Sequence, residues 1–179
     1  MTLDELQEVL STFRKLKTQA ERALAQVRDD ELFGQLDEES NSLAVITKHI
    51  AGNMRSRWTD FLNTDGEKPD RHRDAEFEIL ENEDRDEIFR QWEAGWQVLF
   101  RELEALTAED LGRTVTVRSE PHTVPQALFR QLSHYAQHVG QIVLLAKHLR
   151  SREWQTLSIP KGKCDEVLAS MKLRFEKQQ

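Results

Sequence analysis

The sequence predicts an all-α protein: a four-helix bundle with a short hairpin or extended arm before its last long helix. Two observations favour this fold class. The 179 residues include only seven glycines and four prolines, which favours long helices over many short strands. Apolar residues also recur at spacings of three and four through four long segments, as on one face of a helix. We expect a single domain over residues 1–179, with its core at about residues 2–150 and a C-terminal extension at 151–179.

The first helix is expected over about residues 2–27. Thr2 is a suitable N-cap, and Glu5, three residues later, completes a capping box. At residues 29–31 the acidic run Asp-Asp-Glu interrupts the apolar spacing. We therefore expect a loop from this point to the start of the next helix.

The second helix is expected to begin at Asn41 or Ser42 and to run to about Leu62, just before the turn-forming residues 63–66. The polar stretch 67–82 follows. A connection of this length in a compact domain is usually a functional loop or a crossover along the bundle. Its charged side chains are suited to bonding one another or to lining the mouth of a site: Arg71, Arg73, Asp74 and Glu76.

A third helix is expected over about residues 84–106, and the last long helix over 125–150, with Pro125 in its first turn. Between them, the β-branched residues 114–117 and the residues that follow predict the hairpin or extended arm. The charged tail of the extension is expected to form one short helix. It contains the single cysteine, Cys164, which we interpret as an incidental thiol.

Composition excludes several classes of protein. The net charge of −7 argues against a general affinity for nucleic acid, and no apolar stretch is long enough to cross a membrane. One cysteine rules out a disulfide within the chain and fits a reducing compartment. The N-terminal residues show no signal-peptide pattern, so we expect a cytoplasmic protein with no nucleic-acid or membrane partner.

Three histidines form the candidate site. His134 and His138 lie four residues apart in the last long helix, so their side chains project from the same face, close enough to bind one metal ion. His49, in the middle of the second helix, is the candidate third ligand. The alternative is that these are ordinary histidines bonded to their neighbours.

Two common metal motifs do not fit. A His-Glu-x-x-His metalloprotease helix needs a glutamate where this chain has Tyr135. A di-iron bundle uses Glu-x-x-His motifs, and the chain has no glutamate three residues before any histidine.

His49 and the motif His134-x-x-x-His138-x-Gly140-Gln141 resemble the DinB/YfiT-like superfamily. One branch of this superfamily has no settled activity, and five further segments resemble it: residues 41–43, 52–58, 65–69, 73–77 and 154–160. The resemblance as a whole extends over about residues 6–162. The resemblance implies a four-helix bundle, a homodimer and a divalent-metal site at His49, His134 and His138. Relatives include transferases and isomerases that use low-molecular-weight thiols.

We therefore predict a divalent-metal-dependent enzyme acting on a small molecule, with a thiol-dependent transferase or isomerase-like activity. Asn53 and Gln141 are expected to orient the metal ligands or the substrate. Zinc or nickel is the favoured ion, and iron or manganese also suits imidazole ligands. His122 is a candidate general base, although an ordinary histidine in a surface turn is the simpler interpretation.

The alternative function is a non-catalytic dimeric bundle with a structural metal or none. In that case the tryptophans of the second and third helices, Trp58, Trp92 and Trp96, serve either an interface or the core. A structural site is closed by a fourth protein ligand, whereas a catalytic site keeps one position open.

Overall fold

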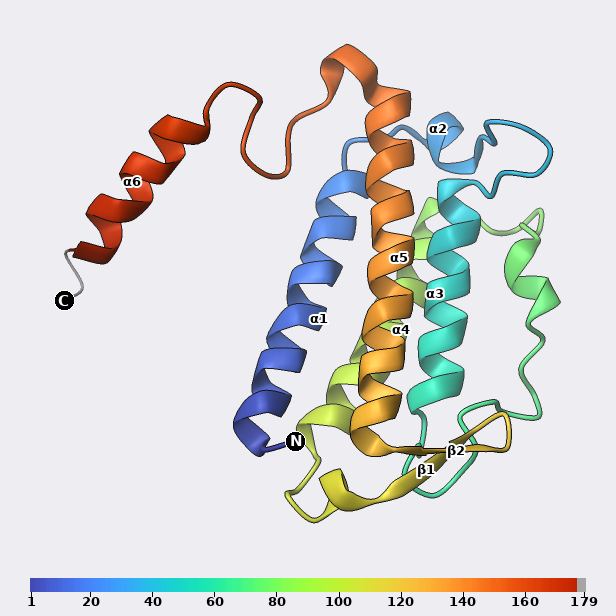
Figure 1. The fold of residues 1–179 in the computed structure, drawn as a ribbon. Helices are drawn as coiled ribbons and strands as arrows, with labels where there is room; N and C mark the ends of the chain where they lie inside the picture. Colours follow the sequence, from blue (N-terminus) through green and yellow to red (C-terminus); the bar gives the residue numbers. More distant parts are fainter. Residues whose placement is uncertain (177–179) are drawn as a thin grey trace.

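The computed structural model describes residues 1–176. Four long helices form a bundle (Figure 1): α1 (Leu3–Leu24), α3 (Leu43–Trp58), α4 (Arg85–Glu104) and α5 (Val124–Arg150). This confirms the expected all-α bundle. α3 and α4 run in the same direction because the connection between them, residues 59–84, returns along the length of the bundle (Figure 1). We call this connection the crossover; it includes the short 3₁₀ helix η1 (Asp74–Phe77).

Local capping interactions set the beginnings of the long helices. In α1 the expected capping box is present, since Thr2 accepts from the backbone of Glu5 and Glu5 accepts from the backbone of Thr2. Ser42 caps α3, Asp84 caps α4 and Thr123 caps α5. Each side-chain oxygen satisfies a backbone N–H group that the first helical turn leaves unpaired.

Three features of the helices differ from the sequence prediction. α1 ends at Leu24 and not at about residue 27. α3 ends at Trp58 and not at Leu62, because Asp60 adopts a positive φ of 47° and its carbonyl accepts from the Thr64 backbone. The acidic run expected to be a loop forms the short helix α2 (Asp29–Phe33). Acidic side chains are favourable in the first turn of a helix, and the Glu31 carboxylate also accepts from the backbone N–H of Arg28.

The core is rich in aromatic side chains. Trp58, Trp92 and Trp96 are at most 1% exposed, so the suggestion that they form a surface interface is wrong. Phe13 and Tyr135 pack beside Trp96 with ring centroids about 6 Å apart. The indole of Trp58 donates to the hydroxyl of Tyr135 (3.1 Å), which joins α3 to α5.

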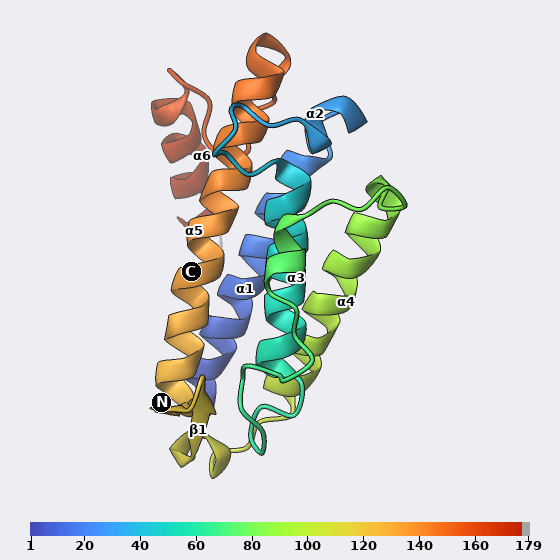
Figure 2. The ribbon, with the colours of Figure 1, turned by 90° about the vertical axis from the view of Figure 1, so that its right-hand side faces the viewer.

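α3 is enclosed on nearly all sides, and only Gly52 and Arg55 among its residues are not buried. The crossover lies over its outer face (Figure 2). Two polar groups of α3 attach the crossover there. Lys48 donates to the carbonyl of Glu78 and to the carboxylate of Glu83, and Ser56 bonds to the backbone at both Gly66 and Lys68.

A two-stranded hairpin closes the lower end of the bundle: β1 (Thr114–Val117) and β2 (Glu120–Thr123), paired antiparallel. Its turn residues, Arg118 and Ser119, both adopt positive φ, as a two-residue primed turn requires. The carboxylate of Asp65 accepts from both of their backbone N–H groups at 2.8 and 2.7 Å. The crossover therefore fixes the hairpin turn next to α3.

The C-terminal extension begins with the 3₁₀ turn η3 (Ser151–Glu153) and ends in the expected short helix, α6 (Cys164–Glu176), which stands apart from the four-helix bundle (Figure 1). Among residues 1–176, no helix has both the length and the apolar character needed to cross a membrane.

Candidate metal centre

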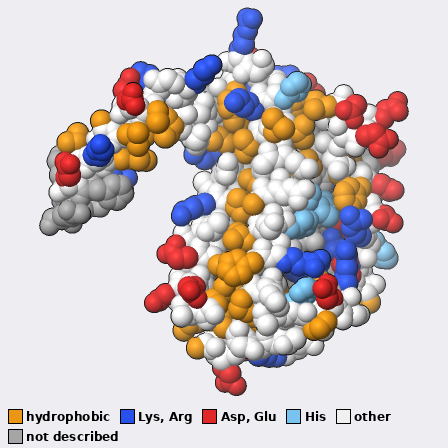
Figure 3. Space-filling model, in the orientation of Figure 1, with side chains coloured by type: hydrophobic (Ala, Val, Ile, Leu, Met, Phe, Trp, Pro, Cys, Tyr) orange, Lys and Arg blue, Asp and Glu red, His pale blue; other side chains and the backbone are white. Residues whose placement is uncertain are grey.

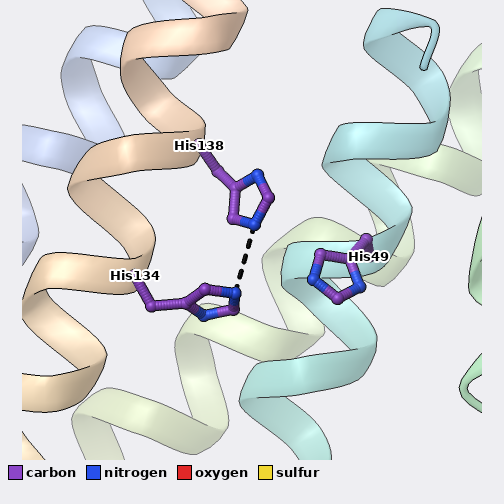
Figure 4. A group of neighbouring side chains, drawn as sticks. All are labelled: His49, His134 and His138. Carbon is purple, nitrogen blue, oxygen red and sulfur yellow. Dashed lines mark hydrogen bonds between the residues drawn. The ribbon is translucent and has the colours of Figure 1, made fainter. Parts of the chain in front are cut away.

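The structure brings His49, His134 and His138 together. His49 projects from α3 toward α5, and the other two project from successive turns of α5 toward α3 (Figure 4). One ring nitrogen from each histidine lies within 4.8 Å of the others. The Nε2 atoms of His134 and His138 are 3.1 Å apart, close to the roughly 3.4 Å separating two ligands on a tetrahedral zinc ion.

Hydrogen bonds hold two of the rings in defined orientations. The Nδ1 atom of His49 lies 2.8 Å from the carboxylate of Glu76, and that of His138 lies 2.7 Å from Oε1 of Gln141. Both partners are acceptors, so Nδ1 carries the proton in each ring and Nε2 has the lone pair that can bind a metal. In the structure the Nε2 atom of His138 makes a hydrogen bond with Nε2 of His134 (Figure 4). The Nδ1 atom of His134 is buried and has no hydrogen-bond partner among residues 1–176.

The surroundings keep the α5 pair neutral. Burial, reinforced by the nearby His138 and His49, lowers the pKa of His134 to about 3. Burial also lowers the pKa of His138, against the opposing effect of its bond to Gln141. At neutral pH both imidazoles therefore present unprotonated nitrogens, the form that binds metal ions.

Glu76 was not singled out for this role from the sequence. It belongs to η1 in the crossover, and Arg71 donates to both of its oxygens at 2.8 Å. Burial alone would raise the pKa of Glu76, but the hydrogen bonds from His49 and Arg71 outweigh burial and lower it. Glu76 is therefore a carboxylate positioned to polarise His49, as in the carboxylate–histidine pairs behind many metal ligands.

Gly52 makes this approach possible. It lies three residues after His49 in α3, and a Cβ atom at this position would come within 2.5 Å of Oε1 of Glu76. Only a residue without a side chain leaves room for the carboxylate. The sequence signal was faint: a glycine inside a helical pattern and a glutamate in the polar stretch, 24 positions apart.

The other predicted residues lie in different settings. Gln141 contacts His138 directly. Asn53 makes no hydrogen bond to the three rings; its Oδ1 accepts from the hydroxyl of Tyr135 (3.0 Å), and its side chain lines a cleft beside His49 and His134. His122 lies in β2 near Glu120, and Cys164 is exposed in α6.

The residues present fit a divalent metal ion. Neutral imidazoles are suitable ligands for several divalent transition metals, zinc, nickel and iron among them. Within the described part of the chain, the group contains no fourth histidine, cysteine or carboxylate ligand. A metal held here would keep at least one coordination position for water or another small molecule.

Together these features define a helical-bundle protein with a three-histidine candidate metal centre. Residues 2–163 match the family described as "Protein of unknown function (DUF1572)", and the chain belongs to this family. The match contains all three histidines and Glu76. A search of curated proteins found no match to the chain.

Proposed function

We propose that this protein is a divalent-metal-dependent enzyme of the DinB/YfiT-like type that acts on a small molecule. The observation that carries the proposal is the convergence of three imidazole nitrogens from α3 and α5 within 4.8 Å. Polar ring nitrogens that face one another between two packed helices are costly unless each has a partner. A divalent ion accepts all three lone pairs at once.

Each residue around the group has a role in this proposal. His49, His134 and His138 hold the ion, with zinc or nickel favoured over iron or manganese. Glu76 and Gln141 fix the tautomers of His49 and His138 through their Nδ1 atoms. Asn53 lines the adjoining cleft, and we expect its amide nitrogen to orient a substrate.

A divalent ion bound here would lower the pKa of a thiol or water that it holds, so that the deprotonated group could act as a nucleophile near neutral pH. The resemblance to thiol-dependent transferases and isomerases supports a low-molecular-weight thiol as the co-substrate. It equally supports a cytoplasmic homodimer. The rival proposal, a non-catalytic bundle with a structural metal, requires a fourth ligand from the protein.

The test is elemental analysis of dialysed protein after incubation with zinc or nickel. We expect about one equivalent in the wild type and a loss in His49→Ala and His138→Ala. His148→Ala is the matched control, because His148 lies on the same helix as His138 but is exposed and outside the group. Full metal occupancy in both His49→Ala and His138→Ala would overturn the three-histidine assignment.

Catalysis requires a second test. The metal-loaded protein should be assayed with low-molecular-weight thiols and electrophilic acceptors, with His138→Ala as the inactive reference. Thiol binding that depends on the metal supports the enzyme. The exchangeable position is measured on the cobalt-substituted protein, whose absorption spectrum changes when an added ligand binds the metal. A metal that stabilises the fold but whose spectrum no added ligand changes would favour the structural alternative.

A further inference from the structure

The cleft beside the histidines is strongly basic. It has a volume of about 240 Å³, and its lining includes His49, His134 and five arginines: Arg57, Arg71, Arg73, Arg118 and Arg130. No carboxylate belongs to this lining within residues 1–176. Figure 3 shows basic side chains gathered beside the histidines on the face where α3 and α5 meet.

Nearby acidic groups balance only part of this charge. Glu67 lies near three of the arginines, at 2.9 Å from Arg118, 3.1 Å from Arg71 and 3.7 Å from Arg57. Glu76 pairs with Arg71 but also bonds to His49. Three carboxylates, Glu67, Glu76 and Glu120, against five arginines leave a net positive charge at the cleft, before any metal adds its own.

Arg57 carries the argument furthest. It comes from the last turn of α3 and is only 4% exposed. Its Nε and Nη1 atoms have no hydrogen-bond partner among the described residues. Burial lowers the pKa of the guanidinium, yet arginine remains charged in proteins. A buried cation with two unused donors is a large cost to a fold.

A second unpaired donor lines the same cleft. The Nε2 atom of Gln131, on α5, is buried and has no hydrogen-bond partner in the part of the chain that the structure describes. Gln131 is itself 2% exposed. The unused atoms of Arg57 and Gln131 are donors, and the unpaired Nδ1 of His134 is also a donor when its Nε2 holds a metal. A ligand that satisfies these groups must therefore supply acceptor oxygens.

We propose that this cleft binds an oxyanion, the carboxylate or phosphate group of a small-molecule substrate, through Arg57 and Gln131 inside the cleft and Arg130 at its rim. Charge-assisted hydrogen bonds from guanidinium to such groups are among the strongest in proteins. The inference rests on the proposed function in one respect: it takes the anion to be part of the molecule presented to the three histidines. It names the substrate class of that site as anionic.

The test uses simple probes on the full chain. Succinate and inorganic phosphate are titrated calorimetrically into zinc-loaded and EDTA-treated protein, with sodium chloride adjusted to constant ionic strength. Succinamide is the neutral counterpart of succinate. We expect saturable binding of succinate, phosphate or both, and no binding of succinamide. The anion that binds more tightly identifies the group that the cleft prefers.

Arg57→Met is the principal variant, because methionine fills much of the space without the charge. We expect anion affinity to fall about tenfold or more, while the melting temperature without anions stays equal or rises. This combination is expected if Arg57 serves to bind the anion, whereas loss of an arginine that stabilises the fold would lower the melting temperature. Arg101→Gln, which removes an exposed arginine of α4 outside the cleft, should bind the probes as the wild type does.

Two further variants keep the test decisive if Arg57→Met does not fold. Among residues 1–176 the one ion pair of Arg130 is a 3.8 Å contact with Glu120, so Arg130→Gln should fold and bind the anions more weakly. Gly66→Ala would place a Cβ atom 2.8 Å from Nη1 of Arg57, displacing the guanidinium without removing its charge. Unchanged anion affinity in both variants, or equal binding of succinamide and succinate, would overturn the proposal.

The anion and metal measurements can contradict the two proposals independently. Anion binding that depends on Arg57 in a protein that takes up no metal would contradict the proposed function and leave the oxyanion site standing. Normal metal uptake with no binding of either anion would contradict the oxyanion site and leave the proposed metal site standing.

Discussion

The Nδ1 atom of His49 lies 2.8 Å from Oε2 of Glu76, a residue 27 positions further along the chain. Both side chains are buried, and Arg71 holds the carboxylate from its other side. This contact joins the crossover to α3 at the candidate metal centre. It makes the crossover a structural part of the site.

Replacing Glu76 with glutamine should weaken metal binding. The amide carries no negative charge, so it polarises His49 less and loses the charged pair with Arg71. Loss of such a partner behind a metal ligand typically costs about 10- to 100-fold in metal affinity. Competition with a zinc-binding chromophore measures the effect. Glu78→Gln, an exposed position two residues further on, should retain wild-type affinity; an equal loss in both variants would contradict the role of Glu76.

Replacing a glycine by alanine should have different consequences at two positions in the long helices. At Gly140, on α5, a Cβ atom would meet nothing within 4 Å, so Gly140→Ala should raise the free energy of unfolding by about 0.5–1 kcal/mol. Gly52→Ala brings the same helix preference but displaces Glu76. Its metal affinity should fall, measured with the same chromophore. A Gly52→Ala protein with full affinity would show that Glu76 tolerates displacement.

The metal-free protein should lose stability as the pH falls below about 6.5. In the unfolded chain the His134 imidazole takes up a proton near pH 6.5, whereas burial lowers its pKa in the folded protein to about 3. The unfolded state binds more protons between these values, so acid favours unfolding. We expect a melting temperature several degrees lower at pH 5 than at pH 7.5 in EDTA, with a smaller drop for His134→Gln. Identical pH dependence in the two proteins would contradict the lowered pKa.

Removing the Tyr135 hydroxyl should destabilise the core. In Tyr135→Phe the indole N–H of Trp58 and the Oδ1 of Asn53 both lose their partner. Unpaired buried groups of this kind cost about 1–3 kcal/mol, which urea denaturation measures directly. Metal uptake should be unchanged, because Tyr135 belongs to the core and not to the histidine group. A cost below about 0.5 kcal/mol would indicate that water replaces the missing hydroxyl.

Much of the fold could be read from local sequence patterns. The capping residues Thr2 and Thr123, and the apolar spacing between the caps, are interactions within a few residues of each other, so one sequence suffices to find them. The end of α3 and the short helix α2 were misjudged. Both depend on small local differences, such as the positive φ of Asp60, that apolar spacing does not register.

The candidate site divides in the same way. His134 and His138 could be paired from the sequence because helical geometry alone places residues four apart on one face. Gln141 is one turn beyond His138 and is equally local. The role of Arg57 is not local: a basic residue near a helix end is usually solvated, and nothing in its neighbours in the sequence shows that it is buried.

Local patterns in the chain are thus enough to predict a helical bundle and one pair of histidines facing the same way. The packing of the folded chain brings His49 to this pair, sets Glu76 behind His49, and gathers arginines from α3, the crossover, the hairpin and α5 around one cleft. Helix periodicity is a property of neighbouring residues, whereas these contacts depend on how helices pack and on the path of an irregular connection whose anchors, Lys48 and Ser56, act only once it is folded against α3.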